Sequence, residues 1–137
     1  MKHTTLIIAS ILLQFSAIMV AKADDEWITI SEDNDGMIWQ AKSGSLQFLE
    51  NNNGVPIFLV TGRANNEALS TIEFEKWYVS ADDCKKRQGN IVTLDISGEF
   101  QYETHFVYGG GNVASGMAEF ICESAIYVIN EANKKGI

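Results

Sequence analysis

The sequence is poor in proline, histidine and cysteine, and it carries no excess of positive charge. One proline and two histidines among 137 residues leave too little of either for a proline-rich linker or a metal site made of several histidines. Acidic residues outnumber basic ones by 18 to 10, which gives a formal net charge of −8 at pH 7. Such a surface repels phosphate groups, so the composition argues against nucleic acids and anionic lipid surfaces as partners.

Long apolar runs are also missing, except for one at the N-terminus. Residues 6–20 are almost entirely apolar, and Ala21-Lys22-Ala23 has the A-x-A form of a signal-peptide cleavage site. The run is too short to span a bilayer, and acidic residues follow directly after the cleavage site. The sequence therefore predicts a cleaved signal peptide over residues 1–23 and a single domain over residues 24–137.

The predicted export sets the compartment and the charge of the mature protein. Two of the ten basic residues, Lys2 and Lys22, lie in the signal and no acidic residue does, so the mature charge is 8 − 18 = −10. We expect a soluble protein of a bacterial periplasm, without membrane insertion after cleavage, and an extracellular or cell-surface position is the alternative. A strongly acidic domain attracts cationic proteins, which makes a cationic protein the expected partner.

Cys84 and Cys122 are an even number of cysteines in a chain predicted to be exported, which favours one disulfide between them. The bridge would close a loop of about 39 residues, which the chain-entropy model values at about 4 kcal/mol. No C-x-x-C motif and no histidine lies beside either cysteine, which argues against a nucleophilic thiol.

Short runs of β-branched and aromatic residues, separated by clusters of glycine, asparagine, aspartate and serine, extend from Trp27 to Phe106. This pattern is typical of an antiparallel meander. The predicted strands are residues 27–30, 37–42, 45–50, 57–63, 70–79, 91–96 and 99–107. Between the last two strands, Ser97-Gly98 fits a two-residue hairpin loop.

Alternation along these strands predicts one buried and one solvated face of the sheet. The residues expected on the buried face are Leu46, Phe48, Ile72, Phe74, Val92, Leu94, Ile96, Phe100 and Tyr102. The chain is also rich in tryptophan, and any exposed tryptophan is a candidate interface anchor because aromatic residues dominate binding hot spots.

The C-terminal segment supplies a cover for this sheet. Apolar residues recur at spacings of three and four from Ala114 to Ala132, which predicts an amphipathic helix. Asn112 is suited to cap its N-terminus, and Lys134-Lys135-Gly136 suits its C-terminal end. The predicted fold class is therefore α+β, with an antiparallel meander of about six to seven strands covered by one C-terminal helix.

Three segments are candidate partner-binding elements, because each concentrates charge or bare backbone at one place. They are Asp33 and Asp35 in an acidic hairpin, Lys85, Lys86 and Arg87 in a cationic cluster after Cys84, and Gly109, Gly110, Gly111 and Asn112 in a glycine loop before the helix. Each also has an ordinary structural interpretation as a turn, a solvated loop or a flexible joint.

The sequence gives little support to catalysis, a cofactor or a metal ion. The acidic hairpin resembles the start of a calcium loop, but the register places Lys42 where a glutamate ligand belongs. Glu73 and Glu75 are about 7 Å apart on one strand, a spacing that some glycosidase carboxylates share. They alternate with apolar residues, so the solvated side of a strand is the favoured interpretation. We therefore expect a non-enzymatic protein without cofactor or metal, with a carboxylate-dependent hydrolase as the alternative.

Parts of the chain resemble small exported bacterial proteins of unassigned activity. The likeness rests on the run from Trp77 to Cys84, on Gly109 to Ser115 and on Phe120 to Cys122. In outline the chain is similar to the surface-adhesin protein E type, which has a signal, an early tryptophan, a meander and a two-cysteine clasp. The small, acidic, disulfide-bonded profile is also similar to that of periplasmic immunity proteins. Neither resemblance implies a functional residue.

These observations predict a protein-binding domain. The first expectation is an inhibitor or immunity protein that neutralises a toxin or effector acting in the cell envelope. The alternative is an exported, adhesin-like surface module.

Overall fold

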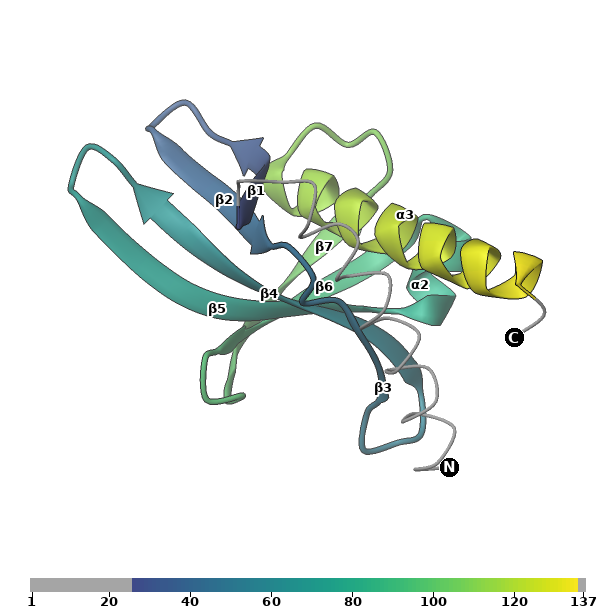
Figure 1. Cartoon of the computed structure of the whole chain (residues 1–137). Coiled ribbons are helices and arrows are strands. Elements are labelled where there is room, and N and C mark those ends of the chain that lie inside the picture. The colour runs from purple at the N-terminus through teal and green to yellow at the C-terminus, as the bar shows by residue number, and fades with distance from the viewer. Residues whose placement is uncertain (1–25, 136–137) are drawn as a thin grey trace.

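A computed structural model of the chain describes residues 26–135 as a seven-stranded antiparallel sheet with a long helix against one face (Figure 1). The elements are β1 (Trp27–Glu32), β2 (Met37–Lys42), β3 (Gln47–Glu50), β4 (Pro56–Asn66), β5 (Thr71–Ser80), α2 (Ala81–Lys86), β6 (Gln88–Asp95), β7 (Phe100–Val107) and α3 (Val113–Lys134). The α+β class, the C-terminal helix and the Cys84–Cys122 disulfide are thereby confirmed. The predicted signal peptide over residues 1–23 and Gly136 lie outside the described residues.

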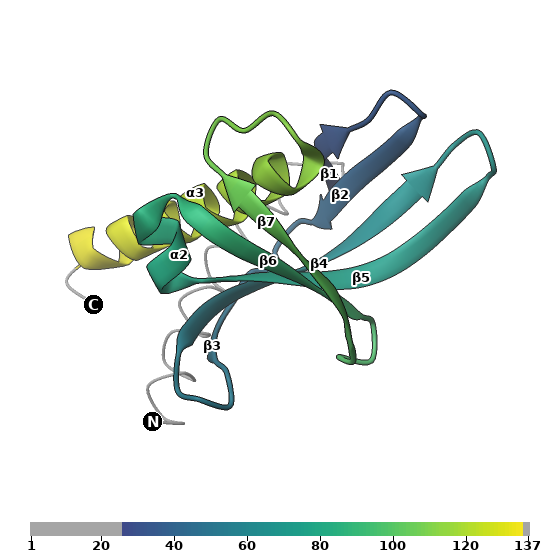
Figure 2. The same cartoon turned by 180° about the vertical axis from the view of Figure 1, so that it is seen from behind.

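The strand order β1-β2-β4-β5-β6-β7 departs from a simple meander only at β3. The central strand β4 has eleven residues, and it pairs β3 over Pro56–Leu59 and β2 over Gly62–Asn66. Its other edge pairs β5 along the whole length of the hairpin. Figures 1 and 2 show α3 across one end of the sheet, while the tips of the β1–β2 and β4–β5 hairpins extend away from it.

The amphipathic pattern of the C-terminal segment forms α3 as predicted. The side chain of Asn112 accepts a hydrogen bond from the Ser115 N–H at 2.9 Å, which confirms the predicted N-cap. The buried residues of the helix are Ala114, Ser115, Met117, Ala118, Ile121, Cys122, Ala125 and Val128. They pack on a sheet face that buries Trp77, Val79 and Phe106 completely. In the part of the chain described, no helix is long and apolar enough to cross a membrane.

The segment around Cys84 is a short helix, α2, where the sequence suggested a loop. Ser80 caps it by accepting a hydrogen bond from the Asp83 N–H at 3.0 Å, and Arg87 ends it with φ 62° in the left-handed region. Asp82 and Asp83 in its first turn and Lys85 and Lys86 in its last turn match the helix dipole. These cap and charge signals are present in the sequence, but a helix of six residues leaves no periodic apolar pattern to reveal it.

Three hairpin turns share one design, in which an Asp or Asn precedes a glycine by three residues. At Asp95 the carboxylate accepts the N–H groups of Ser97 and Glu99, the Gly98 N–H donates to the Asp95 carbonyl, and Gly98 has φ 98°. The loop between Asp95 and Glu99 therefore has three residues, so the predicted two-residue hairpin was wrong. The same arrangement recurs between residues 33 and 37 and between residues 51 and 55.

The predicted buried face was wrong for β5 and for most of β6 and β7. Trp77 and Val79 of β5 face α3, so Ile72 and Phe74 lie on the opposite face and are 49% and 46% exposed. Both faces of this sheet carry apolar residues, so alternation alone did not identify the face under the helix. The residues of the expected buried set that the strand register places opposite to α3 are Ile72, Phe74, Val92, Leu94 and Phe100. Val92 is nevertheless buried, as expected, while Ile96 is exposed in the turn between β6 and β7.

Tyr102 belongs to the helix face although Phe100 does not. The β6–β7 register shifts between Thr93 and Leu94, where Thr93 pairs Tyr102 but Leu94 pairs Phe100. The extra residue, Gln101, reverses the alternation of β7 at this point. The irregularity therefore brings the phenol of Tyr102 to the same face as Trp77 and α3.

Candidate functional site

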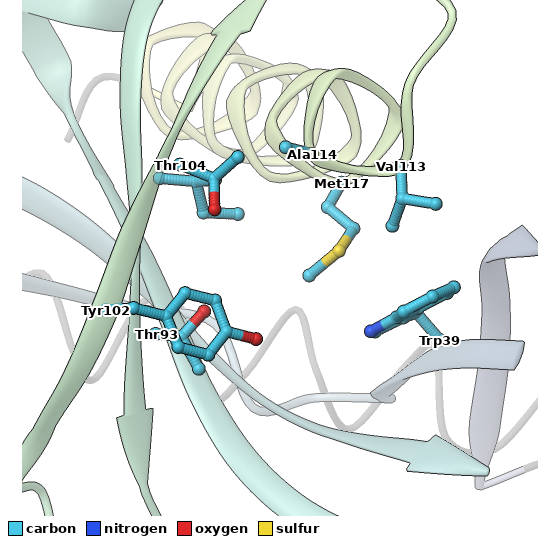
Figure 3. A pocket seen from close by; sticks show the side chains of 8 residues that line it. Trp39, Thr93, Tyr102, Thr104, Val113, Ala114 and Met117 are labelled. Carbon is cyan, nitrogen blue, oxygen red and sulfur yellow. The ribbon is translucent and has the colours of Figure 1, made fainter. Parts of the chain in front are cut away.

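A pocket of about 190 Å³ opens where the first turns of α3 meet the sheet (Figure 3). Its walls come from four elements that are distant in the sequence: β2, β6, β7 and α3. The lining residues are Trp39, Ile91, Thr93, Tyr102, Thr104, Val113, Ala114 and Met117. No single stretch of sequence contains more than three of them, so no local motif announces this site.

Two aromatic side chains face each other across the pocket. In Figure 3 the indole nitrogen of Trp39 and the hydroxyl of Tyr102 point toward one another, and the thioether of Met117 descends from α3 between them. Thr93 and Thr104 add hydroxyl groups on the sheet side. The pocket thus combines apolar walls with a few polar groups, which is the usual composition of a recognition site.

The strand beside the pocket is built around Trp77. Gly62 of β4 pairs Glu75 of β5, and a side chain at Gly62 would collide with the six-membered ring of Trp77, so this glycine is required for the ring to lie there. The indole N–H of Trp77 donates a hydrogen bond of 2.7 Å to Oε1 of Glu75. Glu75 is only 8% exposed, and the prediction of a solvated Glu75 was wrong.

Burial and charge perturb two acids at this site. Desolvation raises the pKa of Glu75, the hydrogen bond from Trp77 opposes that rise, and the negative charge of Glu73 adds to it. The pKa of Tyr102 is raised by desolvation and then by the negative charge of Glu75. The field of the buried carboxylate therefore reaches a group that lines the pocket.

The structure brings together two of the three predicted partner-binding elements, beside α3. The Tyr108 N–H donates to the Arg87 carbonyl at 3.0 Å, and the guanidinium carbon of Arg87 lies 5.3 Å from the centre of the Tyr108 ring. This contact joins the cationic cluster to the glycine loop. Lys85 and Lys86 are exposed on α2. The Tyr108 hydroxyl donates to Glu123 at 3.0 Å, and burial together with that carboxylate raises the pKa of Tyr108 to about 12.

The glycine loop already has a carboxylate of its own. The Gly109 N–H donates to Oε2 of Glu119 at 2.7 Å, and Asn112 serves as the cap of α3. Gly110 is packed so closely on Ser115 and Val107 that a side chain would collide with them, while Gly111 has open space around it. These contacts explain the loop as a strand-to-helix joint.

The acidic hairpin is separate from both other elements. Oδ1 of Asp33 accepts the N–H groups of Asp35 and Met37 at 2.9 and 3.0 Å, so this carboxylate closes its own turn. His105 is exposed on β7, beside the fully buried Phe106. Within residues 26–135, no group of three or more His, Cys, Asp or Glu side chains is arranged to hold a metal ion.

Sequence reasoning missed the pocket, although one signal for it was available. Any exposed tryptophan was a candidate interface anchor, and Trp39 is partly buried at the pocket wall. The position of Tyr102 depends on the irregularity between β6 and β7, which no local pattern predicts. The pocket became visible only once four separate elements were assembled.

Comparison with known proteins found no relative for this chain. No protein-family model, no curated protein and no solved structure matches it.

Proposed function

We propose that this chain is a non-enzymatic binding domain of the cell envelope whose partner is another protein. Its action would be that of an inhibitor or immunity factor that neutralises a toxin or effector. The observation that carries this proposal is the pocket between Trp39 and Tyr102, because its size and lining suit a single side chain of a partner.

The volume of the pocket separates a protein partner from a free metabolite. Pockets that enclose drug-sized ligands have volumes of about 300–1,000 Å³. The pocket here holds about 190 Å³ and opens to solvent beside exposed residues of β7. A space of this size receives one protruding side chain, and the surrounding surface remains available for the rest of an interface. Aromatic anchors in such small pockets supply most of the binding energy in protein complexes.

The walls of the pocket are held in place before binding. Met117 and Ala114 belong to a helix that the Cys84–Cys122 disulfide ties to α2. Trp39 and Tyr102 project from strands that are paired within the sheet. Binding therefore orders few groups of this domain that are not already ordered. The entropic cost of association on this side is small, which favours tight binding.

The charge of the chain supports a basic partner. The full sequence carries a net charge of −8, and removal of the predicted signal would bring it to 8 − 18 = −10. A field of this sign accelerates the approach of a cationic protein and makes the rate depend on salt.

A capture experiment with two tryptophan variants tests the proposal. The full-length gene, with a C-terminal tag, is expressed with export, and mass spectrometry of the purified protein gives its N-terminus. The protein is then used to capture proteins from envelope extracts of producing and neighbouring strains. Trp39→Ala removes one wall of the pocket. Trp27→Ala is the matched control, because Trp27 packs against Phe74, on the sheet face opposite to α3.

The expected result is the capture of a basic protein in stoichiometric amount, which high salt releases. The Trp39→Ala variant should fail to capture it, and the Trp27→Ala variant should still capture it. Capture that survives Trp39→Ala, or recovery of the domain alone, contradicts the proposal. Cell fractionation separates the inhibitor from the adhesin-like alternative, because an inhibitor stays in the periplasm and an adhesin is displayed outside.

A further inference from the structure

Two acidic residues lie on the helix face of β5, between the two aromatic walls of the pocket. In the register of the sheet, Trp39 pairs Ala64 and Ala64 pairs Glu73, while Tyr102 pairs Thr93 and Thr93 pairs Trp77. Glu75 lies between these two rows. We call Glu73 and Glu75 the acidic pair.

The residues of β4 on this face are Gly62, which pairs Glu75, and Ala64, which pairs Glu73. The six-membered ring of Trp77 lies over Gly62, and its indole N–H donates to Oε1 of Glu75. The approach from the pocket to the acidic pair is therefore on the side of Tyr102, which is close enough to feel the charges of both carboxylates.

The acidic pair has no cation of its own in the described part of the chain. The ion pairs found there are Lys42 with Glu26 and Lys134 with Glu131, and neither involves the acidic pair. The nearest cations along the strands, Arg63 and Lys76, alternate onto the opposite face. Glu75 is 8% exposed and its hydrogen-bond donor is the neutral indole of Trp77. A carboxylate this deeply buried without a cation is unusual, because buried charges are ordinarily paired.

The negative field of the acidic pair acts inside the pocket. The charges of Glu75 and Glu73 both contribute to the raised pKa of Tyr102, after the contribution of desolvation. A field that disfavours a phenolate at this hydroxyl favours a positive charge at the same place. Trp39 and Tyr102 add aromatic rings, which attract ammonium and guanidinium groups.

We propose that the pocket receives the side chain of a lysine or arginine from the partner protein. The aliphatic stem lies against Met117 and Val113, and the charged head reaches between Trp39 and Tyr102 toward Glu75. This arrangement uses the apolar lining and the uncompensated carboxylate together, as long cationic side chains do when they bury their stems. The inference rests on the proposed function, since it names the group that the protein partner presents.

Blocked amino acids test the inference without the partner. The probes are N-acetyl-lysine amide, N-acetyl-arginine amide and, as a neutral control of similar length, N-acetyl-norleucine amide. They are titrated into the full ¹⁵N-labelled protein up to about 20 mM, a range that detects free energies of only a few kcal/mol. The indole N–H resonance of Trp39 reports on the pocket wall, and that of Trp27 reports on the opposite face.

The expected result is a saturating shift of the Trp39 indole resonance with the two cationic probes and not with norleucine. Glu75→Gln should weaken this binding by about tenfold, because a charge-assisted contact is replaced by a neutral one. Glu103→Gln is the matched control, since Glu103 pairs Val92 on β6 and lies on the face opposite to α3, and it should leave the affinity unchanged. Two controls must hold: the Trp27 resonance does not shift, and the amide spectrum of each variant shows that its fold is unchanged.

Three results would overturn the inference: equal shifts with norleucine, no loss in Glu75→Gln, or no saturating shift of Trp39 with either cationic probe. They are distinguishable from failure of the proposed function. If a partner is captured through Trp39 but the pocket binds the neutral probe as well as the cationic ones, the protein-binding proposal stands. The proposal of a cationic side chain in the pocket is then wrong. If Glu75→Gln fails to fold, Tyr102→Phe gives a second measure, because it keeps the ring and removes the hydroxyl.

Discussion

The two ends of this sheet share the same strands but differ in what lies against them. At the covered end, where α2 and α3 pack, Trp77 and Val79 of β5 are completely buried. At the open end, Ile72 and Phe74 of the same strand are about half exposed. Ile72 and Phe74 also lie on the face opposite to α3, and on the helix face of β5 the exposed residues Thr71 and Glu73 give way to the buried Glu75, Trp77 and Val79. The comparison teaches that a residue of β5 is buried only where both its face and its position along the strand bring it under the helix.

The pocket lies at the border between these two ends. Its lining includes residues buried under the helix, such as Ile91 and Met117, and an exposed residue, Tyr102. A binding site at this border takes rigidity from the covered end and accessibility from the open end. The two ends should therefore differ in their contributions to stability as they differ in burial.

The largest effect is expected from the disulfide, which joins α2 to α3 at the covered end. Replacing Cys84 and Cys122 by alanine should lower the free energy of unfolding by about 4 kcal/mol, since the bridge constrains the unfolded chain. Urea denaturation of the variant and of the reduced wild-type protein measures the loss. If both lose less than about 1 kcal/mol, the clasp is not what holds the covered end together.

Identical substitutions at the two ends give the sharpest comparison. Ile121→Ala should cost about 2–5 kcal/mol, because Ile121 is completely buried and its removal leaves a cavity. Ile72→Ala should change stability by no more than about 0.5 kcal/mol, because Ile72 is half exposed. Both values come from urea denaturation under the same conditions. Similar costs for the two variants would show that the open end is covered in solution.

Glu75, at the border between the two ends, should make the stability of the protein depend on pH. Because burial raises the pKa of Glu75 above its ordinary value of 4.5, the folded protein binds this proton more tightly than the unfolded chain does. The contribution to stability is complete below pH 4.5 and is lost as the pH rises through the raised pKa. Glu75→Gln should therefore gain stability relative to wild type as the pH rises from about 4 to about 7.

The neighbours of Glu75 define the control for this measurement. Glu73 lies on the same strand, Asp95 pairs Glu75 on β6, and Tyr102 approaches from β7. Hydrogen bonds within its own turn lower the pKa of Asp95, which gives stability of the opposite pH dependence. Glu103→Gln should keep the wild-type pH profile. A constant difference between Glu75→Gln and wild type across the pH range would contradict the prediction.

The smallest effect concerns the tip of the β4–β5 hairpin at the open end. Ser70 has φ 56°, in the left-handed region that glycine adopts without strain. Ser70→Gly should stabilise the protein by about 0.5 kcal/mol, a gain limited by the greater freedom of glycine in the unfolded chain. Gly98→Ala is the reverse experiment, because Gly98 has φ 98° and open space around it, and it should destabilise. Thermal denaturation resolves both changes.

Local signals in the sequence predicted the parts of this fold that depend on neighbouring residues. Asn112 was recognised as a cap, and the helical stripe beginning at Ala114 was recognised from its spacing. The acidic hairpin at Asp33 and Asp35 was located correctly, since the side chain of Asp33 closes a turn of neighbouring residues.

The remainder depended on contacts between distant elements. On β5, apolar residues occur on both faces. From alternation alone, the face with Ile72 and Phe74 and the face with Trp77 and Val79 were equally plausible as the buried one. Only the position of α3 decides between them. Glu75 was misplaced for the same reason, and the site that it adjoins was invisible until β2, β6, β7 and α3 were assembled.

The order of the elements has a consequence for how the protein is made. All seven strands precede α3 in the chain, so a growing polypeptide completes the sheet before the helix that covers it exists. During that interval Phe106 and its buried neighbours are bare, and Cys84 remains a reactive thiol because its partner, Cys122, arrives 38 residues later. The newly made chain therefore depends, for a short time, on protection from aggregation and from incorrect thiol pairing.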